Sequence, residues 1–255
     1  MKISIITVCK NAEDKVRKTI ESVVSQTFSD IEYIVVDGAS ADGTLRVFNE
    51  YSGAFPVKII SEEDSGIYSA MNKGISMASG DYLLFLNAGD YLFNRNVVSI
   101  VHNSLKKSDA DIIYGLCLNI DPETGAVEFD EVQKLDNYLF YYSAMPHQAM
   151  FYRRELFELY GNYNENYKII SDHELNYRFY HIDDIKWKKI NVLVSVHSYG
   201  GMSTSQTFEG LHNKERDNFT VNSFSWFEKL IFGSIMYRLY RKAANAFKFF
   251  IKQVI

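Results

Sequence analysis

The sequence predicts an α/β protein with a doubly wound, mostly parallel sheet flanked by helices. Short apolar segments alternate with amphipathic segments through the first half of the chain, and this order requires parallel strands joined by right-handed crossovers. Polar, turn-forming residues follow these apolar segments, at the edge where such sheets bind ligands. The chain has 255 residues, which suits one large domain or two small ones.

Hydrophobic periodicity places the elements in order. A continuous, β-rich apolar run predicts a buried strand over residues 2–8, and apolar residues at helical spacing predict a helix over 11–25. A hairpin-like turn is expected at 120–125 and a flexible loop at 200–205, whereas the aromatic segment 135–143 fits neither pattern. The same criteria predict strands over 31–36, 57–60, 83–86, 111–118, 150–152 and 189–197, and helices over 44–51, 67–79, 97–107, 154–160 and 171–180.

Composition and charge narrow the function. Hydrophobic residues make up 47% of the chain and charged residues 23%, which is typical of a globular protein. The net charge of −5 disfavours a nucleic-acid-binding role. Cys9 and Cys117 are too few for a disulfide framework. Neither a signal peptide nor an apolar stretch of about 20 residues is visible, so we expect a cytoplasmic protein.

The C-terminal segment has its own charge and pattern. From residue 226 to residue 255, six basic residues stand against one acidic residue, Glu228. Apolar and aromatic residues recur there at helical spacing, which predicts a basic amphipathic helix lying on an anionic membrane surface. The alternative is a helix that packs on the domain or forms an oligomer contact, and the sequence does not fix the oligomeric state.

Three aspartates, Asp37, Asp64 and Asp90, follow successive predicted strands. Because the carboxyl ends of parallel strands meet at one edge, we expect these side chains to lie near one crevice. Gathered carboxylates repel one another unless a cation or hydrogen-bond donors neutralise them, as a metal or a nucleotide would. The alternative is that they are ordinary turn residues. The glycine-rich fingerprints of dinucleotide-binding proteins and of P-loop NTPases are absent.

A series of short motifs runs in order through residues 1–205. They are IITVCKN (5–11), DGASADGT (37–44), SEEDSGIYSAMNKG (61–74), FLNAGD (85–90), PHQ (146–148), GNYNE (161–165), SDHEL (171–175) and GGMS (200–203). With these motifs the chain resembles bacterial family 2 glycosyltransferases, and more narrowly the sugar transferases that build capsule, O-antigen or colanic-acid-type polysaccharide.

The resemblance implies the GT-A fold, with a nucleotide-sugar-binding half (1–118), an acceptor and catalytic half (119–205) and a helical C-terminal tail (206–255). It also implies an inverting transfer from a UDP-sugar to a glycan or lipid-linked sugar, assisted by Mg²⁺ or Mn²⁺. The loop at 200–205 would close on the donor, since its glycines tolerate unusual backbone conformations.

The donor-binding residues also come from the resemblance. Thr7, Asn11 and Asp37 would flank the nucleobase and ribose, with Asp37 accepting a hydrogen bond from uracil N–H. Asp64 and Gly66 would line the uridine and sugar side. The set is completed by Ser40, which either binds the donor or only shapes its turn, and by Asn72 and Asn87.

Asp90 occupies the last position of the family's metal motif. Mg²⁺ is commonly held by one or two carboxylates plus substrate phosphates, and it would neutralise charge on the departing diphosphate. Asn87 and Gly89 stand where many relatives carry carboxylates, so metal is expected to bind weakly alone and tightly with the nucleoside diphosphate. His197 ends a predicted strand and, by resemblance, is a second residue that approaches the metal or diphosphate.

Asp172 opens the predicted helix 171–180 and matches the family's catalytic base, which takes the proton of the acceptor hydroxyl. An acidic residue at a helix start also stabilises the helix by about 0.5–2 kcal/mol, and the two roles are compatible. Arg178 is expected either to pair with Glu174 at i, i+4 or to face phosphate. We interpret His147 as a partly buried structural residue; the alternative, which the resemblance implies, is an acceptor-side or positioning residue.

Two other functions remain open. A sugar-phosphate nucleotidyltransferase is also α/β with carboxylates at strand ends, but it should carry a glycine-rich, basic loop after the first strand, and residues 7–13 (TVCKNAE) contain no glycine. A non-catalytic, sugar-nucleotide-binding paralogue would explain the reduced metal motif, whereas the presence of Asp172 argues against it.

Overall fold

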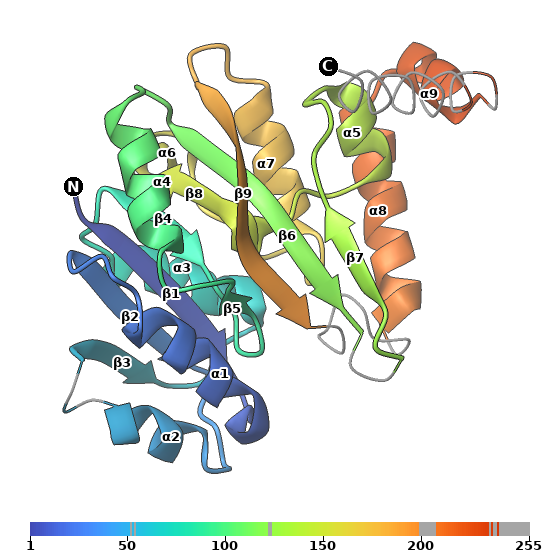
Figure 1. Ribbon diagram of the computed structural model, residues 1–255. Helices are drawn as coiled ribbons and strands as arrows, with labels where there is room; N and C mark the ends of the chain where they lie inside the picture. The colour runs from blue at the N-terminus through green and yellow to red at the C-terminus, as the bar shows by residue number, and fades with distance from the viewer. Residues whose placement is uncertain are drawn as a thin grey trace.

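A mixed sheet of nine strands runs through the part of the chain that the computed structural model describes, namely residues 1–51, 53, 55–121, 124–198, 208–234, 236 and 239 (Figure 1). The strand order is β3-β2-β1-β4-β8-β6-β9-β5, and β7 pairs with β6. Both predicted halves of the chain therefore share one continuous sheet.

The first four strands are parallel, as predicted. The residues of β1, β2 and β4 are buried on both faces, whereas β3 at the sheet edge is partly exposed. A helix connects each strand to the next. The elements are β1 (Ile3–Cys9), α1 (Glu13–Val24), β2 (Ile31–Asp37), α2 (Thr44–Tyr51), β3 (Val57–Ser61), α3 (Ile67–Met77) and β4 (Tyr82–Phe85). Each lies within a few residues of its expected position.

In the second half of the chain, β8 runs opposite to both of its neighbours, because it pairs antiparallel with β4 and with β6. The two long strands β6 and β9 are parallel to each other, and β5 and β7 are added antiparallel. The elements are β5 (Tyr91–Leu92), α4 (Val97–Lys106), β6 (Ile112–Ile120), β7 (Val127–Asp130), α5 (Asn137–Tyr142), the 3₁₀ turn η1 (His147–Ala149), β8 (Met150–Arg153), α6 (Glu155–Tyr160), α7 (Ser171–Tyr180) and β9 (Trp187–Ser198).

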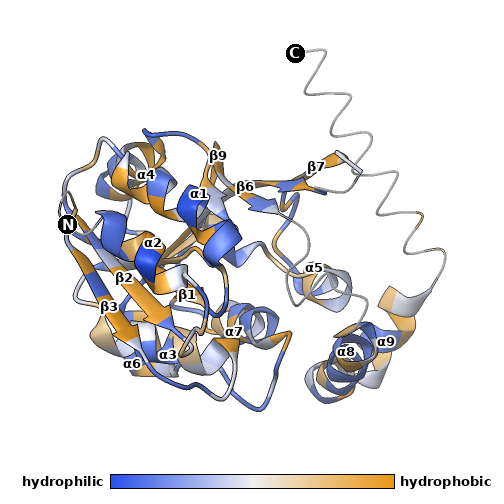
Figure 2. Ribbon diagram, turned by 90° about the horizontal axis from the view of Figure 1, so that it is seen from below, coloured by the Kyte–Doolittle hydropathy of each residue, from blue (hydrophilic) through white to orange (hydrophobic). Residues whose placement is uncertain are grey.

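Helices cover both faces of the sheet, and each face has its own core. Residues on one strand alternate between the two cores: Ile5 packs under α1, α2 and α4, whereas Ile6 packs under α3, α6 and α7. Viewed from below, these two groups of helices lie on opposite sides of the strands (Figure 2). The sheet thereby holds the carboxyl ends of β1 to β4 at one edge.

Two helices follow the sheet. They are α8 (Glu209–Ser223) and α9 (Trp226–Gly233), and α9 begins with a capping box between Ser225 and Glu228. Phe219 and Phe224 are buried in the core on the α7 side of the sheet, so the region after residue 206 is anchored to the domain at α8. The expected loop at 200–203 and most of the expected tail helix lie outside the described residues. None of the helices in the described part of the chain is long and apolar enough to cross a membrane.

The strands β5 and β7 and the helix α5 were not predicted, and α8 was expected only as part of the helical tail over 206–255. Strand β5 has two residues, and β7 alternates apolar and polar residues over four positions only, with Val127 and Phe129 largely exposed. Helix α8 is mostly polar, with Glu215 and Phe219 as its buried residues. Without an apolar stripe, hydrophobic periodicity gives no signal for such a helix.

Candidate active site

A cavity of about 1050 Å³ lies at the carboxyl-terminal edge of the parallel strands. This volume is close to the upper end of the range of small-molecule sites, roughly 300–1,000 Å³. Its wall combines the ends of β1, β4 and β9, parts of α1 and α3, and the start of α7. The sequence-predicted residues on this wall are Asn11, Asp64, Gly66, Asn87, Asp90, Asp172 and His197.

Asp172 lies in the first turn of α7, with its side chain 15% exposed. The Tyr68 hydroxyl lies 2.9 Å from Oδ1 of Asp172 and 2.6 Å from the carbonyl oxygen of Ile169, and its single proton is shared between these two acceptors. Nδ1 of His147 lies 3.0 Å from Oδ2 of Asp172. Since an ionised carboxylate accepts about four hydrogen bonds, these two partners leave it able to accept a proton.

The His147–Asp172 pair shifts both pKa values. Burial alone would lower the pKa of His147, but the hydrogen bond and the charge of Asp172 outweigh burial and raise it. Burial alone would raise the pKa of Asp172, but His147 and the Tyr68 hydroxyl lower it below its ordinary value. Asp172 is therefore ionised at neutral pH, as a general base must be.

Asp90 and His197 meet on another part of the wall. Nδ1 of His197 lies 2.7 Å from Oδ1 of Asp90, whose side chain is 7% exposed. Antiparallel pairing of β5 with the end of β9 brings the two residues together, since Tyr91 pairs with Val196. The sheet topology thus brings the two residues together, and their role at a metal or diphosphate stays a prediction.

Another part of the cavity wall is formed by the loops after β1 and β3. Oδ1 of Asp64 accepts a hydrogen bond from the backbone N–H of Gly66, and Gly66 has φ +145°, a conformation that side chains disfavour. Asn11 adopts φ 47°, and its Oδ1 accepts from the backbone N–H of Ala41. Asn11 thereby joins the loop after β1 to the loop after β2.

The other four predicted donor residues lie behind the wall. Thr7 is fully buried and donates to the Leu86 carbonyl (2.7 Å). Asp37 is also fully buried, and it accepts hydrogen bonds from the hydroxyls of Ser40 and Ser61. Ser40 in turn accepts from the Asn11 backbone N–H, so it shapes the turn.

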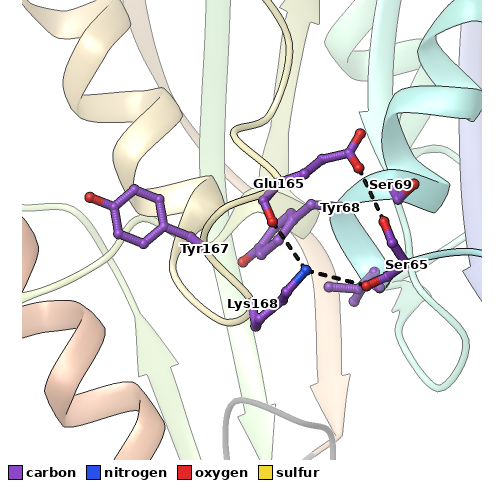
Figure 3. A pocket seen from close by; sticks show the side chains of 8 residues that line it. Ser65, Tyr68, Ser69, Glu165, Tyr167 and Lys168 are labelled. Atoms are coloured by element: carbon purple, nitrogen blue, oxygen red, sulfur yellow. Dashed lines mark hydrogen bonds between the residues drawn. The ribbon is translucent and has the colours of Figure 1, made fainter.

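Asn72 has a structural partner rather than a cavity contact. Its amide binds both the N–H and the carbonyl of Tyr163, which holds the segment before α7 against α3. Nearby, Ser65 donates to Glu165, and Nζ of Lys168 donates to the carbonyls of Ser65 and Glu165 (Figure 3). These contacts join the donor loop after β3 to the segment that leads into α7.

Three residues of the site were missed or misjudged from the sequence. His147, interpreted as structural, lies on the cavity wall and contacts Asp172. Tyr68 falls on the buried stripe of α3, where nothing distinguishes it from a core aromatic. Glu215 of α8 accepts hydrogen bonds from the backbone N–H groups of Lys168, Ile169 and Ile170, immediately before α7. Arg178 forms an i, i+4 ion pair with Glu174. This is the structural role, one of the two roles expected for Arg178 from the sequence.

Sequence comparison identifies the family. A model described as Glycosyl transferase family 2 matches residues 4–161. The chain belongs to this family. A PGL/p-HBAD biosynthesis glycosyltransferase of Mycobacterium bovis (strain BCG / Pasteur 1173P2) is 32% identical over 190 residues, which cover 73% of each chain. The cholesterol galactosyltransferase of Borreliella burgdorferi is 29% identical over 126 residues, or 47% of this chain and 35% of that protein.

Solved structures have the same fold. The chain is similar to S. aureus TarS 1–349 in complex with UDP-GlcNAc, with a TM-score of 0.66, 18% identity and coverage of 79% of this chain and 59% of that one. It is also similar to the mannosyltransferase PcManGT from Pyrobaculum calidifontis in complex with GDP-Man and Mn²⁺, with a TM-score of 0.65, 14% identity and coverage of 88% and 65%. The mostly parallel sheet flanked by helices is thus the GT-A fold of a family 2 glycosyltransferase.

The Asp90–His197 pair offers part of what a divalent cation requires from its ligands. One carboxylate and one imidazole suit Mn²⁺, and a carboxylate suits Mg²⁺. Among the described residues no group of three or more His, Cys, Asp or Glu side chains is arranged to hold a metal. The pair therefore fits a cation that takes most of its ligands from the diphosphate, rather than one held by the protein alone.

Proposed function

We propose that this family 2 enzyme is an inverting glycosyltransferase that moves a sugar from a UDP-sugar to a glycan or lipid-linked sugar in surface polysaccharide biosynthesis. The observation that carries the proposal is the placement of Asp172 on the wall of the cavity that Asp64, Gly66 and Asp90 also line. A base and a donor-side carboxylate on one wall are what a single displacement at an anomeric carbon requires.

The proposed reaction assigns one role to each group. The Asp172 carboxylate takes the proton of the acceptor hydroxyl while that oxygen forms a bond to the anomeric carbon. The bond from this carbon to the diphosphate breaks, and the nucleoside diphosphate leaves with the electron pair. Attack from the side opposite the leaving group inverts the anomeric configuration. Asn11, Asp64, Gly66 and Asn87 hold the donor against the sheet edge.

The donor class is supported by relatives. TarS structures contain UDP-GlcNAc or UDP, and PcManGT contains GDP-Man, so a nucleoside-diphosphate sugar is the expected donor. The choice of uridine rests on the motif resemblance. The predicted contact of Asp37 with uracil stays a prediction, and it requires Ser40 or Ser61 to give up a hydrogen bond to that carboxylate.

A divalent cation at Asp90 and His197 would neutralise charge on the departing diphosphate. Support comes from the Asp90–His197 contact and from the Mn²⁺ in the PcManGT complex. With so few protein ligands, Mn²⁺ alone should bind weakly and Mn²⁺ with UDP tightly. Equal affinity with and without UDP in calorimetry would contradict this.

The test of the function is release of UDP from a panel of UDP-sugars, with and without Mn²⁺. We expect turnover with at least one donor, stimulation by Mn²⁺, and strong loss in Asp172→Asn and in Asp90→Ala. Unchanged turnover in both variants would overturn the site assignment, and binding without turnover would favour the non-catalytic alternative.

We also propose that the C-terminal region contacts an anionic membrane, where a lipid-linked acceptor would be found. In α9, Trp226 (74%), Phe227 (56%) and Leu230 (63%) are exposed, and the sequence that follows is basic. Replacing the three with Ser should reduce flotation with vesicles that contain anionic lipid, and should leave UDP release unchanged. Undiminished flotation would exclude α9 as the contact.

A further inference from the structure

One line of hydrogen bonds joins the loop after β4 to the start of α7. Nδ2 of Asn87 lies 3.2 Å from Nε2 of His147, and Nδ1 of the same imidazole lies 3.0 Å from Oδ2 of Asp172. All three residues lie on the wall of the cavity. His147 comes from η1, which follows Pro146 and is not part of either neighbouring element.

In the orientation found in the structure, with its nitrogen toward Nε2, the Asn87 amide fits one state of the imidazole. An amide NH₂ group only donates, so the Nε2 that faces it carries no proton. The imidazole is then neutral with its proton on Nδ1, and Nδ1–H donates to Asp172. Together with the Tyr68 hydroxyl, this donor holds both oxygens of the carboxylate in one orientation and leaves lone pairs for the incoming proton.

Asn87 also explains why an amide rather than a carboxylate occupies this position. A carboxylate only accepts, so it would favour the imidazolium form of His147. Asp172 would then be paired with a full positive charge and would be a weaker base. An amide whose NH₂ group faces Nε2 favours the neutral form.

We propose that His147 is a positioning residue for Asp172, and that Asn87 keeps its imidazole neutral while the acceptor is deprotonated. The proposal rests on the proposed function, in which Asp172 is the base. The charged groups that face the imidazole are Asp172 from α7 and Asp90 from the loop after β4, and Tyr68 of α3 lies beyond Asp172. In this proposal Asn87, which stands where many relatives carry a carboxylate, acts on the imidazole of His147 and not on a metal.

The kinetic test compares two substitutions of His147 in UDP release from a donor that the wild type uses. His147→Phe keeps an aromatic ring but removes both nitrogens, and kcat should fall about 100-fold, with KM for the donor within about twofold of wild type. In His147→Asn the amide nitrogen takes the place of Nδ1, and kcat should be about tenfold higher than in His147→Phe. An unchanged kcat in His147→Phe, or equal losses in both variants together with weaker UDP binding, would overturn the positioning role.

A spectroscopic test does not depend on turnover. In the full-length protein with ¹⁵N-labelled histidine and without metal, His147 should show a protonated Nδ1 and an unprotonated Nε2 at pH 8. In Asn87→Asp the imidazolium form should persist to a pH higher by about one unit. An Nε2-protonated tautomer in the wild type, or the same transition in both proteins, would overturn the proposal. Absence of UDP binding and turnover in the wild type would instead count against the proposed function, and the spectra would still decide the state of His147.

Discussion

The end of β2 and the first turn of α7 each carry an aspartate, Asp37 and Asp172, and the two surroundings differ. Asp37 is fully buried and its oxygens accept from the backbone N–H of Ser40 and from the hydroxyls of Ser40 and Ser61. Asp172 lies on the cavity wall and is held by two side chains, His147 and Tyr68. The acceptor positions of Asp37 are already occupied by Ser40 of the following loop, by Ser61 of β3 and by the Cys9 thiol of β1. Asp172 is oriented but still able to react.

This difference shows what a carboxylate near the sheet edge does and does not indicate. Its place in the fold brings it to the ligand-binding edge of the sheet. Whether it then serves the ligand depends on how many donors the surrounding chain already directs at it. Asp37 should therefore contribute mainly to stability, and Asp172 mainly to chemistry.

The largest effect is expected from Asp172→Asn. An amide at this position cannot take the acceptor proton, so UDP release in the presence of acceptor should fall about 10³-fold, within the range known for general bases. The unfolding free energy should change by less than about 1 kcal/mol, because an amide still accepts one hydrogen bond. Steady-state kinetics and urea unfolding measure the two quantities.

A matched control for this variant is available on the same helix. Glu174 pairs with Arg178 and is not on the cavity wall. Glu174→Gln removes the same charge two residues away and should leave turnover within about threefold of wild type. Similar losses in both variants would mean that the charge of the helix start, and not a base at Asp172, supports turnover.

Asp37→Asn should have the opposite profile. The amide would direct an NH₂ group at one of the donors from Ser40 or Ser61, so a buried network would break and the unfolding free energy should fall by about 3 kcal/mol. Urea unfolding gives this value, and calorimetry with UDP at low temperature isolates any direct contact with uracil. Wild-type stability combined with weaker UDP binding would show that Asp37 serves the nucleotide instead.

The sequence predicted what depends on local pattern. The four parallel strands are short, largely apolar segments, so their existence and their shared edge follow from the sequence pattern. The same edge places Asp64 and Asp90 on the cavity wall. Asp172 was placed by motif resemblance together with its position at a helix start. These inferences need no knowledge of how distant segments meet.

What the sequence did not predict depends on contacts between distant segments. The saturation of Asp37 needs Ser61, which reaches it through the β2–β3 register. Tyr68 and Glu215 approach the start of α7 from α3 and α8, about 100 residues before and 45 residues after it in sequence. A buried tyrosine on an apolar stripe and a glutamate in a polar helix look ordinary until the packing is known.

The next largest effect concerns His173, which is adjacent to Asp172 but belongs to the core. It is 1% exposed and packs between Phe140 and Phe219, and burial, with the nearby Arg216 charge, lowers its pKa to about 3. The unfolded chain binds this proton near pH 6.5, so the stabilising effect is present above pH 6.5 and is lost progressively as the pH falls toward 3.

His173→Phe should therefore remove part of the acid sensitivity. Between pH 7 and pH 5 the wild type should lose about 2 kcal/mol of unfolding free energy through this group, and the variant should not lose that part. Urea unfolding at the two pH values measures the difference. The control is His181→Phe at an exposed position, which should lose as much unfolding free energy between pH 7 and pH 5 as the wild type. If His173→Phe also loses as much as the wild type, the assignment to His173 is wrong.

The smallest expected effect is that of Glu215→Gln, which tests how the helix start that carries Asp172 is held. Oε1 of Glu215 accepts from the N–H of Lys168 (2.7 Å), and Oε2 accepts from those of Ile169 (3.0 Å) and Ile170 (3.3 Å). Gln replaces one of these acceptors with a donor that faces a backbone N–H, so the unfolding free energy should fall by about 1 kcal/mol. Because the segment before Asp172 then loosens, kcat should fall about threefold to tenfold while KM for the donor stays near wild type. A loss of stability with unchanged kcat would show that α8 supports the fold only, and that His147 and Tyr68 alone orient the carboxylate.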